Sequence, residues 1–195
     1  MEEDYRTQYD LITYISNNDM SLADNYEQAC EIIDIDSFID YYALEIYIAN
    51  QDWLPNNCAY WRSRECNAKN QYYDGRWRWM LFDTDQDAVL TETTDDTIQH
   101  AIDNDQVFAS LIRNEKVQIM LCQKLMEISD IYEANYNEWI DAWLADMSDD
   151  VKYSYKRFWG ENAIDGYFQN MIDSMRAYPE ERERYLNQYM ELHFD

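Results

Sequence analysis

Two short acidic segments hold the residues whose types and spacing suggest chemistry. The first reads DWLPNN and places Asp52 five positions before Asn57. The second reads DTD and places Asp83 and Asp85 directly after an apolar run. A hard cation such as Mg²⁺ takes oxygen ligands, commonly one or two carboxylates together with substrate phosphates. Two carboxylates so close in the chain also repel each other without a cation. The spacing therefore predicts a divalent-cation site that combines the two segments.

Protein kinases hold Mg²⁺ and ATP with two comparable parts. In one loop an aspartate activates the acceptor hydroxyl and a nearby asparagine binds metal, and a second metal-binding aspartate follows a strand. Asp52 and Asn57 fit the first part, and Asp83 or Asp85 fits the second. The alternative readings are structural. Asp52 would cap a backbone N–H and Asn57 would form a turn. Asp83 and Asp85 would be a solvated strand end.

The pattern along the chain predicts a mostly α fold with a small β-hairpin, in the α+β class. Helices are expected over residues 4–17, 24–33, 37–50, 94–103, 105–131, 133–146, 149–158, 162–177 and 180–193. Two strands are expected at Cys58–Arg64 and Arg76–Phe82, with Asp74-Gly75 as the turn signal between them. The second strand becomes fully apolar, which predicts that part of it is covered on both faces.

Three features refine the predicted helices. Ser37 and Asp40 resemble a capping box, which predicts a helix that opens at Ser37. The apolar stripe of that helix leaves Glu45 on the solvent side. Pro179 is expected to separate the last two helices, because proline interrupts a helix interior.

Composition argues against several classes of function. The chain has 15 basic and 40 acidic residues, a net charge of -25, which repels phosphate backbones and anionic lipid. A nucleic-acid partner is therefore not expected. With 3 glycines and 2 histidines, a glycine-rich phosphate loop and a histidine-rich site are not expected either. The sequence has no apolar run of membrane-spanning length, and its acidic start is unlike a signal peptide. Its 195 residues suggest one domain.

Cysteine, histidine and basic residues leave alternatives open. Cys58 and Cys66 are close enough in sequence for a disulfide across a hairpin, but free thiols are favoured. His100 and His193 are expected to be ordinary surface or helix-end residues. A basic cluster in the hairpin would bind phosphate or an acidic substrate, or pair with the chain's own carboxylates, and pairing is favoured. Its members are Arg62, Arg64, Lys69, Arg76 and Arg78.

The central sequence resembles the CotH (spore-coat protein H) kinase family. The resemblance lies in IDSFIDYYALEIYIANQDWLPNNCAYWR, followed by DGRWRWMLFDTDQD, and it extends to VFASLIRNEKVQIML and MIDSMRAYPEERERYLNQYMELHF near the end. It implies a protein-kinase-like C-lobe over residues 1–195, without an N-terminal lobe. It also implies transfer of the γ-phosphate of Mg²⁺-bound ATP to Ser or Thr of secreted or spore-coat proteins, with Mn²⁺ or Ca²⁺ as other cations.

The resemblance assigns roles to particular residues. Asp52 matches the catalytic-loop aspartate. Asn57, helped by Asn56, matches the asparagine that binds metal and cofactor. Asp85, with Asp83 beside it, matches the metal-binding D-x-D of the family. These roles imply ATP and a coat or cell-surface protein as partners, and an extracellular, cell-surface or spore-coat location.

Two departures from the family favour an alternative for the isolated chain. The family's D-x-D is usually followed by Phe-Gly, where this chain has QDAV over residues 86–89. Its first 51 residues read as helices rather than strands, with no lysine before Lys69. The alternative is a non-catalytic pseudokinase or surface protein-interaction module. A Ca²⁺-binding surface domain is a weaker option, since no D-x-D-x-D-G loop supports it.

Overall fold

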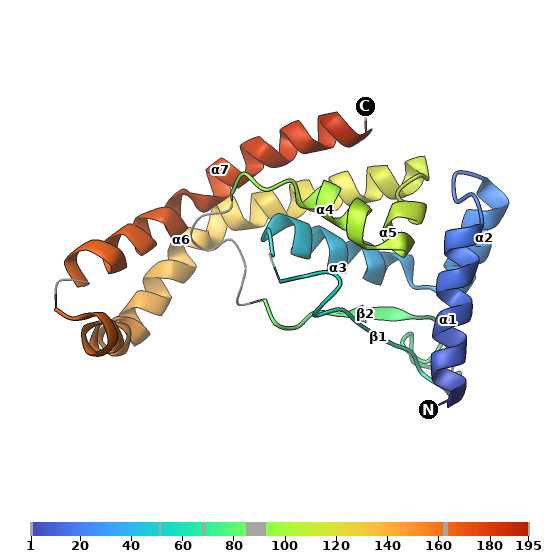
Figure 1. The fold of residues 1–195 in the computed structure, drawn as a ribbon, viewed down its shortest axis with the longest axis horizontal. Coiled ribbons are helices and arrows are strands. Elements are labelled where there is room, and N and C mark those ends of the chain that lie inside the picture. The colour runs from blue at the N-terminus through green and yellow to red at the C-terminus, as the bar shows by residue number, and fades with distance from the viewer. Residues whose placement is uncertain (1, 51, 68, 85–92, 162–163, 195) are drawn as a thin grey trace.

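The computed structural model describes residues 2–50, 52–67, 69–84, 93–161 and 164–194 (Figure 1). They form a mostly helical structure with a small antiparallel sheet, which confirms the predicted mixture. In chain order the elements are α1 (Glu2–Asn17), α2 (Ala23–Ile32), α3 (Ile35–Tyr47), β1 (Ala59–Trp61), β2 (Arg78–Met80), α4 (Thr97–Asn104), α5 (Gln106–Leu111), α6 (Glu115–Trp159), the π-helical turn η1 (Ile164–Phe168) and α7 (Gln169–Phe194). Among the described residues no helix is both long and apolar enough to cross a membrane.

The helix α3 lies at the centre of the molecule, between α6 and the β-hairpin (Figure 1). It begins earlier than the Ser37 prediction, because the Asp34 side chain accepts the Ser37 N–H at 3.4 Å and caps the helix. The prediction for Glu45 is also wrong, since this residue is fully buried. The apolar stripe argument assumes one buried face, whereas α3 is covered on most of its circumference by other elements.

The β-hairpin is shorter than predicted and pairs Tyr60 with Trp79 at its centre. Trp79 anchors it to α3, with its ring 5.0 Å from that of Phe38. Residues 80–82 were expected to be covered on both faces, but their side chains are 40–48% exposed. The reason is that β2 ends at Met80 and has only β1 as a neighbour among the described strands, so the chain beyond it runs along the surface.

The three helices predicted between residues 105 and 158 correspond to the short helix α5 and one long helix, α6. It has 45 residues, which corresponds to a length of about 68 Å. The predicted breaks near residues 132 and 147 contain neither glycine nor proline, so nothing in the chain interrupts the backbone hydrogen bonds. Asn114 caps its start, and Gly160 ends it with a positive φ of 88°.

The helix α7 returns antiparallel to α6 (Figure 1). The predicted break at Pro179 is wrong, since this residue lies inside α7. Tertiary packing explains why the helix continues. Pro179 and Tyr178 are both buried, and the Tyr178 hydroxyl donates to the Tyr47 carbonyl at 2.6 Å. These contacts offset the loss of a backbone hydrogen bond at the proline.

Candidate active site

The first acidic segment begins where α3 ends and returns the chain toward β1. Asp52 is exposed, and its backbone N–H donates to the Asn50 side-chain oxygen at 3.1 Å. The Asn57 amide nitrogen donates to both the carbonyl and the carboxylate of Asp52, each at 3.1 Å. The structure therefore brings the two predicted residues together. Because Asn57 uses its nitrogen in these bonds, its amide oxygen is the atom suited to bind a cation.

Buried side chains hold this loop from beneath. Trp53 is fully buried, and its indole N–H donates to the Tyr41 hydroxyl at 3.0 Å. That hydroxyl in turn donates to the Asn57 carbonyl at 3.4 Å. Burial is the main cause that raises the pKa of Tyr41. The hydroxyl therefore stays protonated and can donate this hydrogen bond. The loop is thereby fixed to α3 at both of its ends.

His100 fixes the same loop from the side of α4. Its Nε2 lies 2.8 Å from the Trp53 carbonyl, and since a carbonyl only accepts, Nε2 carries the proton of this bond. His193 likewise lies 2.8 Å from a carboxylate oxygen of Asp96, at the start of α4. His193 lies in the last turn of α7, as the helix-end alternative predicted, whereas His100 lies within α4 and contacts the loop. A lone histidine outside any motif gave no signal of these contacts.

Asn56 and Asp85 have less structural support. Asn56 is exposed, and its carbonyl accepts the Leu54 N–H at 3.1 Å, which shapes the turn. Asp85 lies outside the described residues, as does the QDAV sequence that departs from the family. The predicted roles of Asn56 and Asp85 as ligands therefore remain predictions.

Asp83 is exposed and lies three residues after the end of β2. Its carbonyl accepts a hydrogen bond from the Asn50 side-chain nitrogen at 3.5 Å. Since the same amide also accepts from Asp52, one buried side chain touches both acidic segments. The sequence analysis missed Asn50, because contacts with backbone atoms of other segments leave no signature in the sequence.

Backbone strain is concentrated in these two segments. The described residues other than glycine that have a positive φ are Ala49, Leu54, Asn57 and Asp83, with values of 50–58°. The left-handed region is unfavourable for residues with a side chain, and such conformations cluster at active sites and ligand clamps. All four lie within the two acidic segments or at their border, which supports a functional reading of both.

The oxygen donors here suit a hard cation. Asn57 and Asp83 supply amide and carboxylate oxygens, the ligands that Mg²⁺ prefers. Within the described ranges, no three His, Cys, Asp or Glu side chains gather into a metal cluster.

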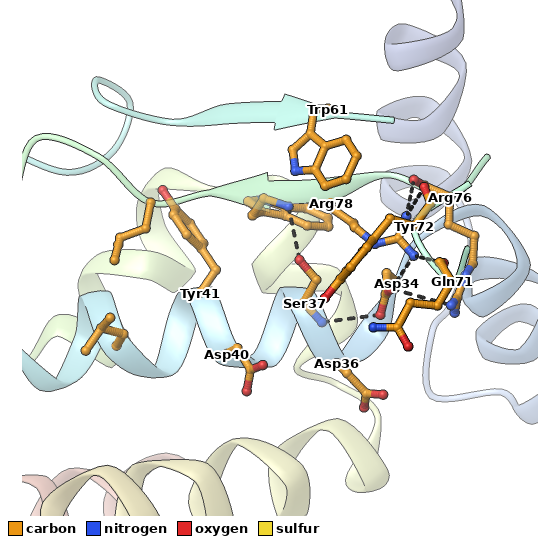
Figure 2. A pocket seen from close by; sticks show the side chains of 13 residues that line it. Asp34, Asp36, Ser37, Asp40, Tyr41, Trp61, Gln71, Tyr72, Arg76 and Arg78 are labelled. Carbon is orange, nitrogen blue, oxygen red and sulfur yellow. Dashed lines mark hydrogen bonds and ion pairs between the residues drawn. The ribbon is translucent and has the colours of Figure 1, made fainter. Parts of the chain in front are cut away.

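A cavity of about 590 Å³ lies between α3 and the hairpin (Figure 2). Its lining does not include Asp52, Asn57 or Asp83, so this cavity lies beside the candidate site and not at it. Tyr41 belongs to both, because it lines the cavity and its hydroxyl contacts the Asn57 carbonyl.

The hairpin arginines that line this cavity are bound to the chain's own carboxylates. Arg78 lies 2.7 Å from Asp34 and 2.8 Å from Asp74, and the rings of Trp61 and Tyr72 lie against its guanidinium (Figure 2). Hydrogen bonding from Arg78 holds the pKa of Asp74 well below its usual range. For Arg76 and Arg78 the predicted pairing is confirmed.

The cysteines follow the favoured alternative. Cys58 and Cys66 are both free thiols. Burial is the main reason that the pKa of Cys58 is raised, which favours its thiol form, and its sulfur lies 3.2 Å from the Tyr60 hydroxyl.

Comparison with known proteins identifies the family to which the chain belongs. No curated protein and no solved structure matches the chain. Residues 1–186 match the family described as CotH kinase protein, a span that includes both acidic segments and nearly all of the helices. Since this match covers far more than half of the 195 residues, the chain belongs to the CotH kinase family.

Proposed function

We propose that this chain carries the catalytic and metal-binding residues of a protein kinase that acts on Ser or Thr hydroxyls. The observation that carries the proposal is the double hydrogen bond from the Asn57 amide to Asp52, at 3.1 Å on each side. It holds an exposed carboxylate beside an amide oxygen, which are the base and the metal ligand that this reaction needs. Membership of the CotH kinase family supports the same reading.

In the proposed reaction Asp52 accepts the proton of the acceptor hydroxyl. The hydroxyl oxygen forms a bond to the γ-phosphorus of ATP, and the bond from that phosphorus to the bridging oxygen breaks, so ADP leaves. Asp52 suits this role because it is exposed and oriented by Asn57. The hydrogen bonds from Trp53 and His100 restrict the loop, and precise positioning supplies much of the rate in phosphoryl transfer.

Mg²⁺ is the proposed cation, held by the Asn57 amide oxygen and by carboxylates of the segment 83–85. When bound, it would neutralise charge on the transferring phosphate. The proposed acceptors are coat or cell-surface proteins, in line with the family. The rival function is a non-catalytic binding module that keeps the loop geometry without transferring phosphate.

The test compares Asp52→Asn with a matched control, Asp149→Asn, an exposed aspartate on α6. The full chain is incubated with Mg²⁺ and γ-labelled ATP, both alone and with casein as a Ser/Thr-rich acceptor. We expect Asp52→Asn to reduce transfer by at least about 100-fold, the lower end of the effect of general base catalysis, and Asp149→Asn to leave it unchanged. Equal transfer by both variants would reject Asp52 as the base. Binding of ATP without transfer by the unmodified chain would favour the binding module.

A further inference from the structure

Asn50 is a buried polar residue whose side chain contacts the proposed base, Asp52. It follows the end of α3, and only 1% of its surface is exposed. Its backbone N–H donates to the Glu45 carbonyl at 3.3 Å, which ties it to the last turn of the helix. A buried amide is retained only where its polar atoms find partners, because leaving them unpaired is unfavourable.

Every polar atom of the Asn50 side chain has a partner. Its nitrogen donates to the Glu45 carboxylate at 2.9 Å and to the Asp83 carbonyl at 3.5 Å. Its oxygen accepts the Asp52 N–H at 3.1 Å. An amide has two N–H donors and one carbonyl oxygen, and these three contacts use all of them. The partners belong to three different segments: the core helix, the loop of the proposed base, and the strand end of the proposed metal ligand.

Other side chains would not satisfy this set of partners. Aspartate has no N–H to donate and would repel the fully buried Glu45 carboxylate. Alanine would leave the Glu45 and Asp83 oxygens without this donor. Serine offers a single donor for two acceptors. The site thus requires a short side chain with two donors and one acceptor.

We propose that Asn50 is a positioning residue that sets the distance between the Asp52 loop and the Asp83 segment. This inference rests on the proposed function. Glu45 lies on α3, which is packed on several sides, so the amide is fixed to the core and both acidic segments are fixed to the amide. Groups that orient metal ligands from behind typically change metal affinity by about 10- to 100-fold when they are removed.

The test measures Mn²⁺ binding to the full chain in the presence of ADP, by electron paramagnetic resonance of the unbound ion. Asn50→Ala is compared with Asn114→Ala. Asn114 is a buried amide of similar type that caps α6 and donates to the Met20 carbonyl at 2.7 Å, away from both acidic segments. We expect Asn50→Ala to weaken Mn²⁺ binding by about 10- to 100-fold and Asn114→Ala to leave it within about two-fold.

A second measurement avoids reliance on a variant that fails to fold. In the ¹⁵N-labelled unmodified chain, saturating Mg²⁺ with ADP is expected to shift the side-chain amide signals of Asn50 and to leave those of Asn114 in place. Equal Mn²⁺ affinities in the two variants, or unmoved Asn50 signals at saturation, would overturn the positioning role while the proposed function stands. Failure of the unmodified chain to bind Mn²⁺ would overturn both.

Discussion

Aromatic side chains are buried in one region of the molecule and exposed in another. In the body around α3, rings pack against one another at 0–6% exposure, as those of Phe38, Tyr42, Trp53, Trp79 and Phe108 do. At the far end of the α6–α7 pair, large aromatic side chains are 65–73% exposed, namely those of Tyr153, Phe158, Trp159 and Tyr167. The residue types are the same, so composition does not explain the difference.

What differs is the number of elements that cover each ring. The body places α3 against α6, α4 and β2, whereas the far end contains only α6, α7 and η1 among the described elements. Its buried residues form a small separate cluster of Ile140, Phe168 and Ile172. Asp52, Asn57 and Asp83 lie on the body. Proposed catalytic loops with strained backbone need rigid support, and the body is the part of the chain that provides it.

The largest expected effect is loss of a ring from the body. Phe108 is fully buried, with its ring centre 4.7 Å from that of Tyr42. Phe108→Ala should lower the free energy of unfolding by about 3–5 kcal/mol, because it leaves a cavity in a packed core. Phe158→Ala, at an exposed ring, should change it by less than about 0.5 kcal/mol. Urea denaturation measures both, and similar losses in the two variants would contradict the contrast between the regions.

A buried charge gives the next effect. Arg182 is fully buried and donates to the Ile46 carbonyl at 2.6 Å and the Tyr47 carbonyl at 3.0 Å, at the end of α3. It also donates to the carbonyls of Thr93 and Asp95, which follow the segment 85–92. Arg182→Met should lower the free energy of unfolding by about 3 kcal/mol, because several buried carbonyls lose their hydrogen-bond donor together.

The control for this prediction is Arg184→Met, an exposed position two residues further along α7. It should leave the unfolding free energy within about 0.5 kcal/mol of the unmodified chain. Thermal and urea unfolding of both variants measure the difference. If Arg182→Met were as stable as Arg184→Met, the hydrogen bonds of Arg182 would not be what holds α7 against the body.

Acid should weaken the hairpin that borders the proposed site. Hydrogen bonding from Arg78 keeps the pKa of Asp74 lower in the folded chain than in the unfolded chain. The stabilisation is therefore complete above the unfolded pKa of about 3.9 and is lost as the pH falls below it. Asp74→Asn should be less stable at pH 7, by under about 1 kcal/mol for a partly exposed pair, and should lose less stability below pH ~4. Identical acid dependence of the two chains would contradict this pairing.

The sequence predicted helices and strands better than it predicted which side chains are buried. Helix periodicity located most helices, and the strand patterns at 58–64 and 76–82 contained both strands, since both signals depend on neighbours in the chain. Glu45 and Pro179 were misjudged for a common reason. The first was taken as exposed and the second as a helix break, and each result was reversed by contacts with residues far away in sequence.

The candidate site was predicted in part for a similar reason. Asp52 and Asn57 lie in one short segment, so their spacing was enough to predict that they act together. Asn50 and His100 act by bonds to backbone carbonyls, which carry no side-chain signature in the sequence. Only the fold shows that such residues reach the same loop.

Removal of a single methyl group tests the comparison between body and far end. Ile46 is buried in the body and Ile140 in the small cluster, and Ile→Val removes one methyl group from each, worth about 0.5–1.5 kcal/mol. Regions with little buried apolar contact open locally, below the free energy of global unfolding. Ile46→Val should therefore lower amide-exchange protection throughout the slowest-exchanging helices. Ile140→Val should lower it only around residues 136–158 and 168–175, and a uniform loss in both variants would show that the far end unfolds together with the body.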